Sequence, residues 1–91
     1  MMSKESKDTI IQKFATHKGD TGSPQVQIAI LSYEIQELSG HLQLHKKDHS
    51  SRRGLLKKVG QRRRLMRYLK KEDQSGYEKL IKALKLKDTI S

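Results

Sequence analysis

The chain has 91 residues, of which 33% are hydrophobic, and it contains no cysteine. This length predicts one domain, residues 1–91, with a small core, and it argues against a deep, enclosed active site. Without cysteine, the chain forms no disulfides, thiolate zinc sites or cysteine nucleophiles. Twenty Lys and Arg against ten Asp and Glu give a formal net charge of +10. Because solubility requires only a few units of charge, this excess predicts a polyanionic partner, either a nucleic acid or an anionic membrane.

The first half of the sequence predicts two helices. Its first residues, MMSKESKDTIIQK, are polar and charged, so we expect neither a signal peptide nor a membrane-spanning segment. A short helix over residues 3–16 is predicted from three apolar residues at helical spacing, Ile10, Ile11 and Phe14. The sequence HKGDTGSPQ that follows is a loop by composition. Ser23 suits an N-cap and Pro24 the first position of a long helix that ends near residue 44. The apolar stripe of this helix is formed by Ile28, Leu31, Ile35, Leu38 and Leu42.

The second half predicts another long helix and a short one. The long helix starts near Ser50 or Ser51, both of which suit an N-cap. Its apolar stripe is Leu55, Val59, Met66 and Leu69, flanked by Leu56 and Leu65. Arg62 falls inside this stripe, and we expect its stem to pack while its guanidinium reaches solvent. A break at KEDQSG precedes a short helix with Tyr77, Leu80, Ile81 and Leu84. The predicted fold is all-α: two long antiparallel helices with a short N-terminal and a short C-terminal helix.

The stretch HKKDHSSRRG, residues 45–54, combines imidazoles, a carboxylate, hydroxyls and cations. His41 and His45 lie one helical turn apart, and Asp48 or His49 offers a third metal ligand. No further ligand motif supports a metal site, however, and the neighbouring lysines and arginines repel a dication. No catalytic motif is present either, although histidines beside cations keep RNA cleavage as an alternative to test. We therefore expect no metal, no cofactor and no enzyme.

Recognition of structured RNA accounts better for this mixture of side chains. The side of the third helix opposite its apolar stripe carries Arg53, Lys57, Gly60, Arg64, Tyr68 and Lys71, which is typical of a nucleic-acid contact face. In the wide minor groove of A-form RNA, the Asp48 carboxylate can accept from the guanine amine and a serine can serve a 2′-hydroxyl. Asp48 also suits two structural roles, as a helix cap or as a partner of Arg52. Gln27 and His41 share one flank of the second helix about 20 Å apart, which predicts two separate contact zones.

These residues carry a family resemblance. DTGSPQVQ, followed by GHLQLHKKDHSSRRGLLKKVGQRRRLMRYLK, closely resembles the bacterial small-subunit ribosomal protein fifteen family over essentially the whole chain. The resemblance implies a structural, four-helix protein that binds the 16S rRNA central domain, clamps a three-way junction and a nearby duplex with a G–U/G–C step, and nucleates assembly of the platform. It implies junction contacts for Thr21, Gly22, Gln27 and Tyr68, with Arg64 and Lys71 nearby, and minor-groove contacts for His41, Asp48 and Ser51. Gln25 departs from the glutamate that is usual in the family, which changes only the charge of the first helical turn.

The resemblance also implies other partners and a location. The partners are neighbouring small-subunit proteins recruited later and, as further candidates, 23S rRNA at a subunit bridge and the chain's own mRNA. It implies a cytoplasmic protein in the ribosome that is a monomer outside it and does not bind a membrane. The alternative is a basic DNA-binding module with the two long helices as a helix-turn-helix. We expect a corner longer than the usual three or four residues and longer helices than that motif has, and both features argue against it.

Overall fold

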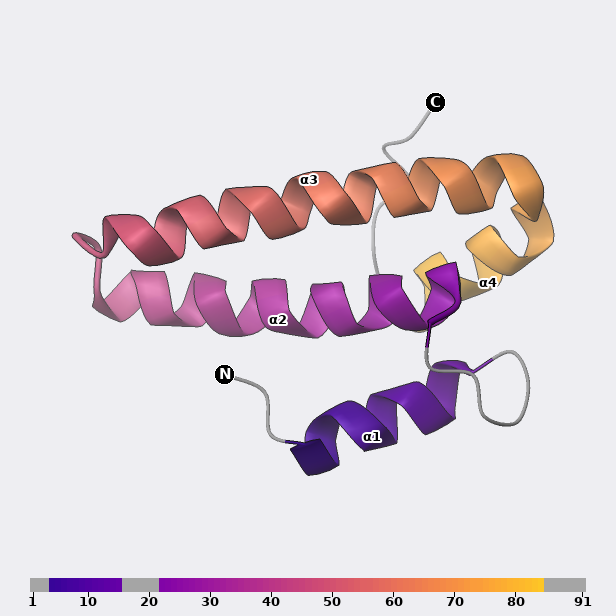
Figure 1. The fold of residues 1–91 in the computed structure, drawn as a ribbon, viewed down its shortest axis with the longest axis horizontal. Helices are drawn as coiled ribbons and strands as arrows, with labels where there is room; N and C mark the ends of the chain where they lie inside the picture. The colour runs from indigo at the N-terminus through magenta and orange to yellow at the C-terminus, as the bar shows by residue number, and fades with distance from the viewer. Residues whose placement is uncertain (1–3, 16–21, 85–91) are drawn as a thin grey trace.

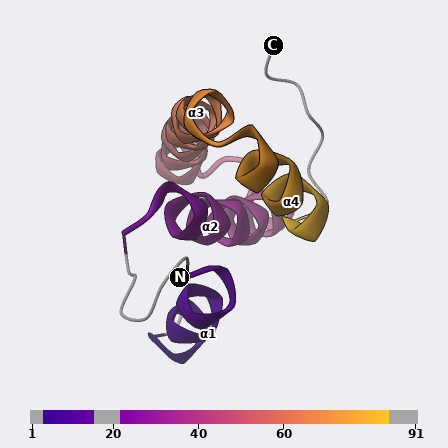
Figure 2. The same ribbon diagram turned by 90° about the vertical axis from the view of Figure 1, so that its right-hand side faces the viewer.

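The computed structural model describes residues 4–15 and 22–84, and these residues form four α-helices and no strand. The helices are α1 (Lys4–Phe14), α2 (Pro24–Leu44), α3 (His49–Glu72) and α4 (Gln74–Leu84). The long helices α2 and α3 run antiparallel, and α4 turns back beside them (Figure 1). Helix α1 lies on the side of α2 that faces away from α3 (Figure 2). The predicted all-α fold, with two long helices and two short ones, is confirmed.

Helix α2 begins where its local sequence predicts. Ser23 has an extended backbone, with φ −64° and ψ 156°, and its side chain accepts a hydrogen bond from the backbone N–H of Val26. Pro24 occupies the first turn, where its missing N–H costs no hydrogen bond. Because a side-chain cap satisfies a backbone donor that has no partner within the helix, this pair of residues sets the start of α2.

The corner between α2 and α3 consists of residues 45–48. Four residues are within the usual length of a helix-turn-helix corner, so the expectation of a longer corner is wrong. The N-cap of α3 is Asp48, whose side chain accepts from the backbone N–H of Ser51. Ser50 and Ser51, where the sequence predicts the start of this helix, instead lie inside its first turn, and the N-cap is the alternative considered for Asp48. Helix lengths of 21 and 24 residues and the antiparallel packing still separate this hairpin from a helix-turn-helix, whose helices cross at about 90–120°.

The core lies where α2, α3 and α4 meet. Its central cluster consists of Ile28, Met66, Leu69, Tyr77 and Leu80, and Phe14 of α1 packs against this cluster. Most of the predicted stripe residues are buried or half-buried, but Leu56 is 66% exposed and takes no part in the core. The Arg62 side chain is half-buried, and its guanidinium donates to the Ser32 hydroxyl of α2 at 3.3 Å. Arg62 therefore packs along its stem as predicted, but its charged end binds α2.

Helices α3 and α4 are separated by Asp73 alone. The backbone N–H of Asp73 closes α3 on the carbonyl of Leu69, and its side chain accepts from the backbone N–H of Gly76 in the first turn of α4. A β-carbon at Gly76 would collide with the Asp73 carboxylate, so glycine leaves room for this side chain in its capping position. The turn carries the fully buried Tyr77 back into the core, where it holds α4 against α2 and α3.

Candidate nucleic-acid interface

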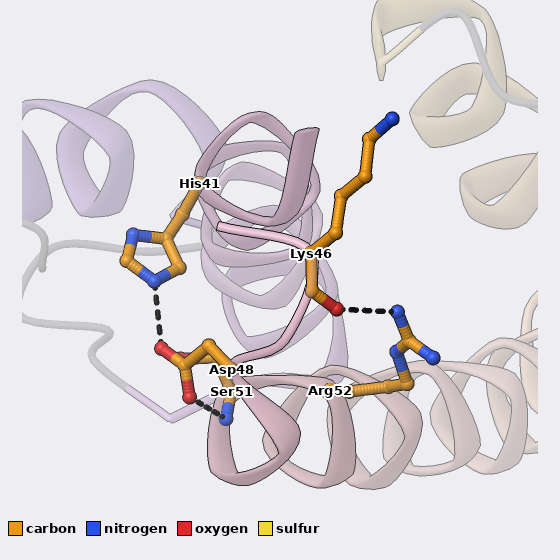
Figure 3. Close-up of polar contacts among 5 residues, drawn as sticks. All are labelled: His41, Lys46, Asp48, Ser51 and Arg52. Carbon is orange, nitrogen blue, oxygen red and sulfur yellow. Dashed lines mark hydrogen bonds and ion pairs between the residues drawn. The ribbon is translucent and has the colours of Figure 1, made fainter. Parts of the chain in front are cut away.

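The corner brings together the three residues that the sequence assigns to the minor groove. His41 Nε2 lies 2.8 Å from Asp48 Oδ2, and the Ser51 hydroxyl donates to the same oxygen at 2.7 Å. The Ser51 backbone N–H donates to Asp48 Oδ1 at 3.1 Å. Asp48 thus ties the last turn of α2 to the first turn of α3 (Figure 3). The Asp48 side chain therefore both caps α3 and holds the three residues of the predicted site together.

The hydrogen bonds of this cluster fix its polarity. The Ser51 hydroxyl, followed by His41 and the Ser51 backbone N–H, lowers the pKa of Asp48 far below its usual value, so the side chain is a carboxylate at neutral pH. A carboxylate only accepts hydrogen bonds, so His41 Nε2 and the Ser51 hydroxyl both supply a hydrogen. Because the hydroxyl hydrogen of Ser51 points to Asp48, the partly exposed Ser51 and Asp48 side-chain oxygens offer only acceptor lone pairs to a partner molecule.

A hydrogen bond between Arg52 and Lys46 also spans the corner beside this cluster. The Arg52 guanidinium donates to the backbone carbonyl of Lys46 at 3.0 Å, on the other side of the corner from His41 (Figure 3). The pairing of Asp48 with Arg52, one of the two structural roles considered above, is therefore wrong, while the cap is confirmed. The rings of His41 and His45 stack with their centroids 4.6 Å apart. Both contacts restrain the chain that carries the cluster.

The basic face predicted on α3 is exposed. Its four cations reach solvent, namely Arg53, Lys57, Arg64 and Lys71, and Tyr68 between them is 55% exposed. Space is open in front of Gly60, where a β-carbon would meet no atom within 4 Å. Cations with an outward tyrosine match the arrangement by which proteins contact phosphates and unpaired bases.

The opposite end of α2 holds the other predicted zone. The Gln27 side chain is exposed and donates through Nε2 to the carbonyl of Gly22. Gly22 is exposed and has an ordinary backbone conformation, with no left-handed φ. Thr21 lies outside the described residues. Gln27 and Arg64, from facing helices, both line a groove of about 430 Å³ between α2 and α3, so the structure joins this zone to the basic face.

Sequence reasoning missed one contact at this groove. Lys58 of α3 donates to Glu34 Oε2 of α2 at 3.2 Å, and the two side chains are 26% and 18% exposed. Glu34 shares a flank with Gln27 and His41, which is visible in the sequence, but its partner lies 24 residues further along the chain. Only the register of the helix hairpin brings the two charges together.

The described residues contain no group of three or more His, Cys, Asp or Glu side chains that could hold a metal ion. In the same part of the chain, none of the helices is both long enough and apolar enough to cross a membrane. The fold and these surfaces define the class: a small, basic, helical protein whose described candidate residues lie on exposed or half-exposed parts of the surface.

Comparison with known proteins narrows this class to one family. The family model for Ribosomal protein S15 matches residues 7–87. The chain is 56% identical over 86 residues to the small ribosomal subunit protein uS15 of Limosilactobacillus fermentum, covering 94% of this chain and 97% of that protein. It is 58% identical over 87 residues to the protein of the same name from a Thermoanaerobacter species, covering 96% and 99%. The chain belongs to the ribosomal protein S15 family and is a structural constituent of the small ribosomal subunit, not an enzyme.

Proposed function

We propose that this chain is a single RNA-binding domain that recognises the central domain of 16S rRNA directly, through two zones. Thr21, Gly22, Gln27 and Tyr68 meet a three-way junction, with Arg64 and Lys71 on the neighbouring phosphates. His41, Asp48 and Ser51 read the minor groove of an adjacent duplex with a G–U/G–C step. The observation that carries this proposal is the corner cluster, in which one carboxylate holds His41 and Ser51 beside it.

The polarity of the cluster suits the proposed duplex. The RNA minor groove offers two kinds of donor, the guanine amine and the 2′-hydroxyl. The acceptor face of Asp48 and Ser51 complements both of them. A carboxylate weakens phosphate binding by repulsion, so its place beside Lys46 and Lys47 favours a role in reading bases.

Two contact zones on one helix hairpin would select one arrangement of the RNA helices. A body that contacts a junction and a duplex about 20 Å apart binds the one arrangement of junction arms that presents both at this spacing. The population of RNA shifts toward that arrangement by no more than the difference in affinity. Later proteins of the platform then find their sites formed, which is how a monomeric cytoplasmic protein nucleates assembly in the ribosome. In this proposal, 23S rRNA at a subunit bridge and the chain's own mRNA are further candidate partners.

Chemical footprinting of a 16S central-domain transcript, with and without the protein, tests this proposal. We expect two separate protections, one at the three-way junction and one in the duplex, and an intact RNA after incubation. Protection of only one region contradicts the clamp. Competition with duplex DNA at matched salt tests the DNA-binding alternative, because equal affinity for DNA removes the preference for folded RNA.

A further inference from the structure

The groove between α2 and α3 has the features of a binding site for one unpaired base. Its volume of about 430 Å³ lies within the range of small-ligand sites, about 300–1,000 Å³. Apolar residues of both helices line it, namely Ile30, Leu31 and Leu65, together with the polar side chains of Gln27, Glu34, Gln61 and Arg64. We propose that this groove takes an unpaired guanine and that Glu34 is the residue that selects it. The inference rests on the proposed function, since it names one nucleotide that the junction supplies.

Glu34 has the acceptor chemistry that guanine requires. Its Oε2 accepts one hydrogen bond from Lys58 and can accept a second, and within the described part of the chain Oε1 has no hydrogen-bond partner, so both oxygens can meet a pair of donors. The Watson–Crick edge of guanine presents two adjacent donors, the ring N–H and the amine, and only guanine among the four bases offers such a pair to a carboxylate. Adenine and cytosine pair one donor with an acceptor, which a carboxylate repels, and the single N–H of uracil lies between two carbonyls.

The charge of Glu34 is compensated, so the carboxylate is compatible with a polyanion. Lys58 lies 3.2 Å away and neutralises it locally, and Arg64 on the same groove offers a cation to the phosphate of an inserted nucleotide. The remaining N–H of the Gln27 amide and the amide of Gln61 can donate to the guanine carbonyl. The aliphatic side chains then contact the faces of the base, as apolar side chains do in pockets that hold a base outside the stack.

The test combines protein variants with base substitutions. Each unpaired guanine of a synthetic 16S three-way junction is replaced in turn by inosine, which lacks the amine, and the affinity is measured for wild type and Glu34→Gln. We expect one inosine position to weaken wild-type binding about tenfold or more, and Glu34→Gln to lose a similar factor with guanine present. Inosine at that position should then add little to the loss in Glu34→Gln, because both changes remove the same hydrogen bond.

Two further variants separate base recognition from structure. Lys58→Met breaks the ion pair but keeps the carboxylate, so it should still distinguish guanine from inosine, and its thermal stability should change as much as that of Glu34→Gln. Glu37→Gln alters an exposed carboxylate of α2 outside the groove and should bind as wild type does. Guanine discrimination that survives in Glu34→Gln at every position overturns the inference. A wild-type protein with no preference for the junction over an unrelated duplex contradicts the proposed function itself.

Discussion

Replacing Arg64 with glutamine tests the basic face of α3 through the salt dependence of RNA binding. Arg64 is exposed and lines the groove between the long helices, so it can reach a phosphate without moving the core. If it neutralises one phosphate, the slope of log affinity against log salt becomes shallower by about 0.7–0.9 in the variant. Glutamine keeps part of the stem and a polar end, so the change is mainly one of charge.

The magnitude of the change in affinity follows from the share of the salt slope that one cation of this face contributes. Four exposed cations, Arg53, Lys57, Arg64 and Lys71, together supply a slope of about 3 to 4 when each meets one phosphate. Arg64 accounts for about 0.7–0.9 of this slope. Raising the salt from about 50 to about 200 mM then reduces the ratio of wild-type to Arg64→Gln affinity by a factor of about 2.6–3.5. Such a change is well resolved in a binding titration.

The assay is fluorescence anisotropy with the 16S junction RNA at four salt concentrations. Lys79→Gln is the matched control, because it removes one exposed positive charge from α4, a helix that carries no residue of either zone. Its salt slope should equal that of wild type. Parallel lines for wild type and Arg64→Gln, or equal changes in the two variants, would refute the placement of this face at the phosphates.

The other predictions concern the corner, the loop and the core. Asp48→Ala should weaken binding to the cognate RNA while leaving binding to unrelated duplexes unchanged or slightly stronger, and inosine at the contacted duplex guanine should add little to the loss. The folded-state pKa of Asp48 lies below that of the unfolded chain, so its stabilisation is complete at neutral pH and lost as the pH falls below about 4. Asp48→Asn, which still caps, should show less of this loss in thermal melts. Gly22→Ala should weaken RNA binding at unchanged Tm, since a β-carbon there meets no atom and φ is ordinary. Ile28→Ala should cost about 2–5 kcal/mol of unfolding free energy and therefore lower Tm by roughly 8–40 °C, since the side chain is fully buried.

Each of these predictions has a contrary outcome. Asp48→Ala losses that are fully additive with inosine mean that the residue acts as a helix cap alone. Equal acid sensitivity of wild type and Asp48→Asn assigns the pH dependence to other carboxylates. A lower Tm in Gly22→Ala makes the loop part of the fold and not a contact surface. Ile28→Val, which removes one methyl group, is the control for the core and should cost about 0.5–1.5 kcal/mol.

Local signals in the sequence predict the helices and the start of α2. The Ser23–Pro24 pair marks a helix start without help from the rest of the fold, because both effects act within one turn. The start of α3 near Ser50 or Ser51 is predicted two or three residues too late, since three residues within four positions, Asp48, Ser50 and Ser51, each suit the N-cap. Asp48 takes the position in a structure where it also bonds His41, seven residues earlier across the corner.

Contacts across the hairpin depend on its register, which local sequence does not determine. Glu34 with Lys58 and Ser32 with Arg62 are 24 and 30 residues apart, and both pairs are centred on Lys46 and Lys47. Once the corner is known to fall at these two lysines, residues equally distant from it face each other. The same register explains the orientation of the Arg62 guanidinium, because it places the Ser32 hydroxyl at hydrogen-bond distance from it.

The few contacts that hold α1 determine which part of the molecule unfolds locally first. Among the described residues, the backbone of α1 lies close to α2 only, and its apolar contacts come from the buried Ile10 and from the half-buried Phe14, which reaches the central cluster that α2, α3 and α4 share. Detaching α1 breaks few apolar contacts and leaves the hairpin whole, so its amides exchange with deuterium through a local opening of lower free energy than global unfolding. The amides of α2 and α3 at the central cluster exchange last. We therefore expect the hairpin that carries His41, Asp48 and Arg64 to persist through fluctuations that release the N-terminal helix.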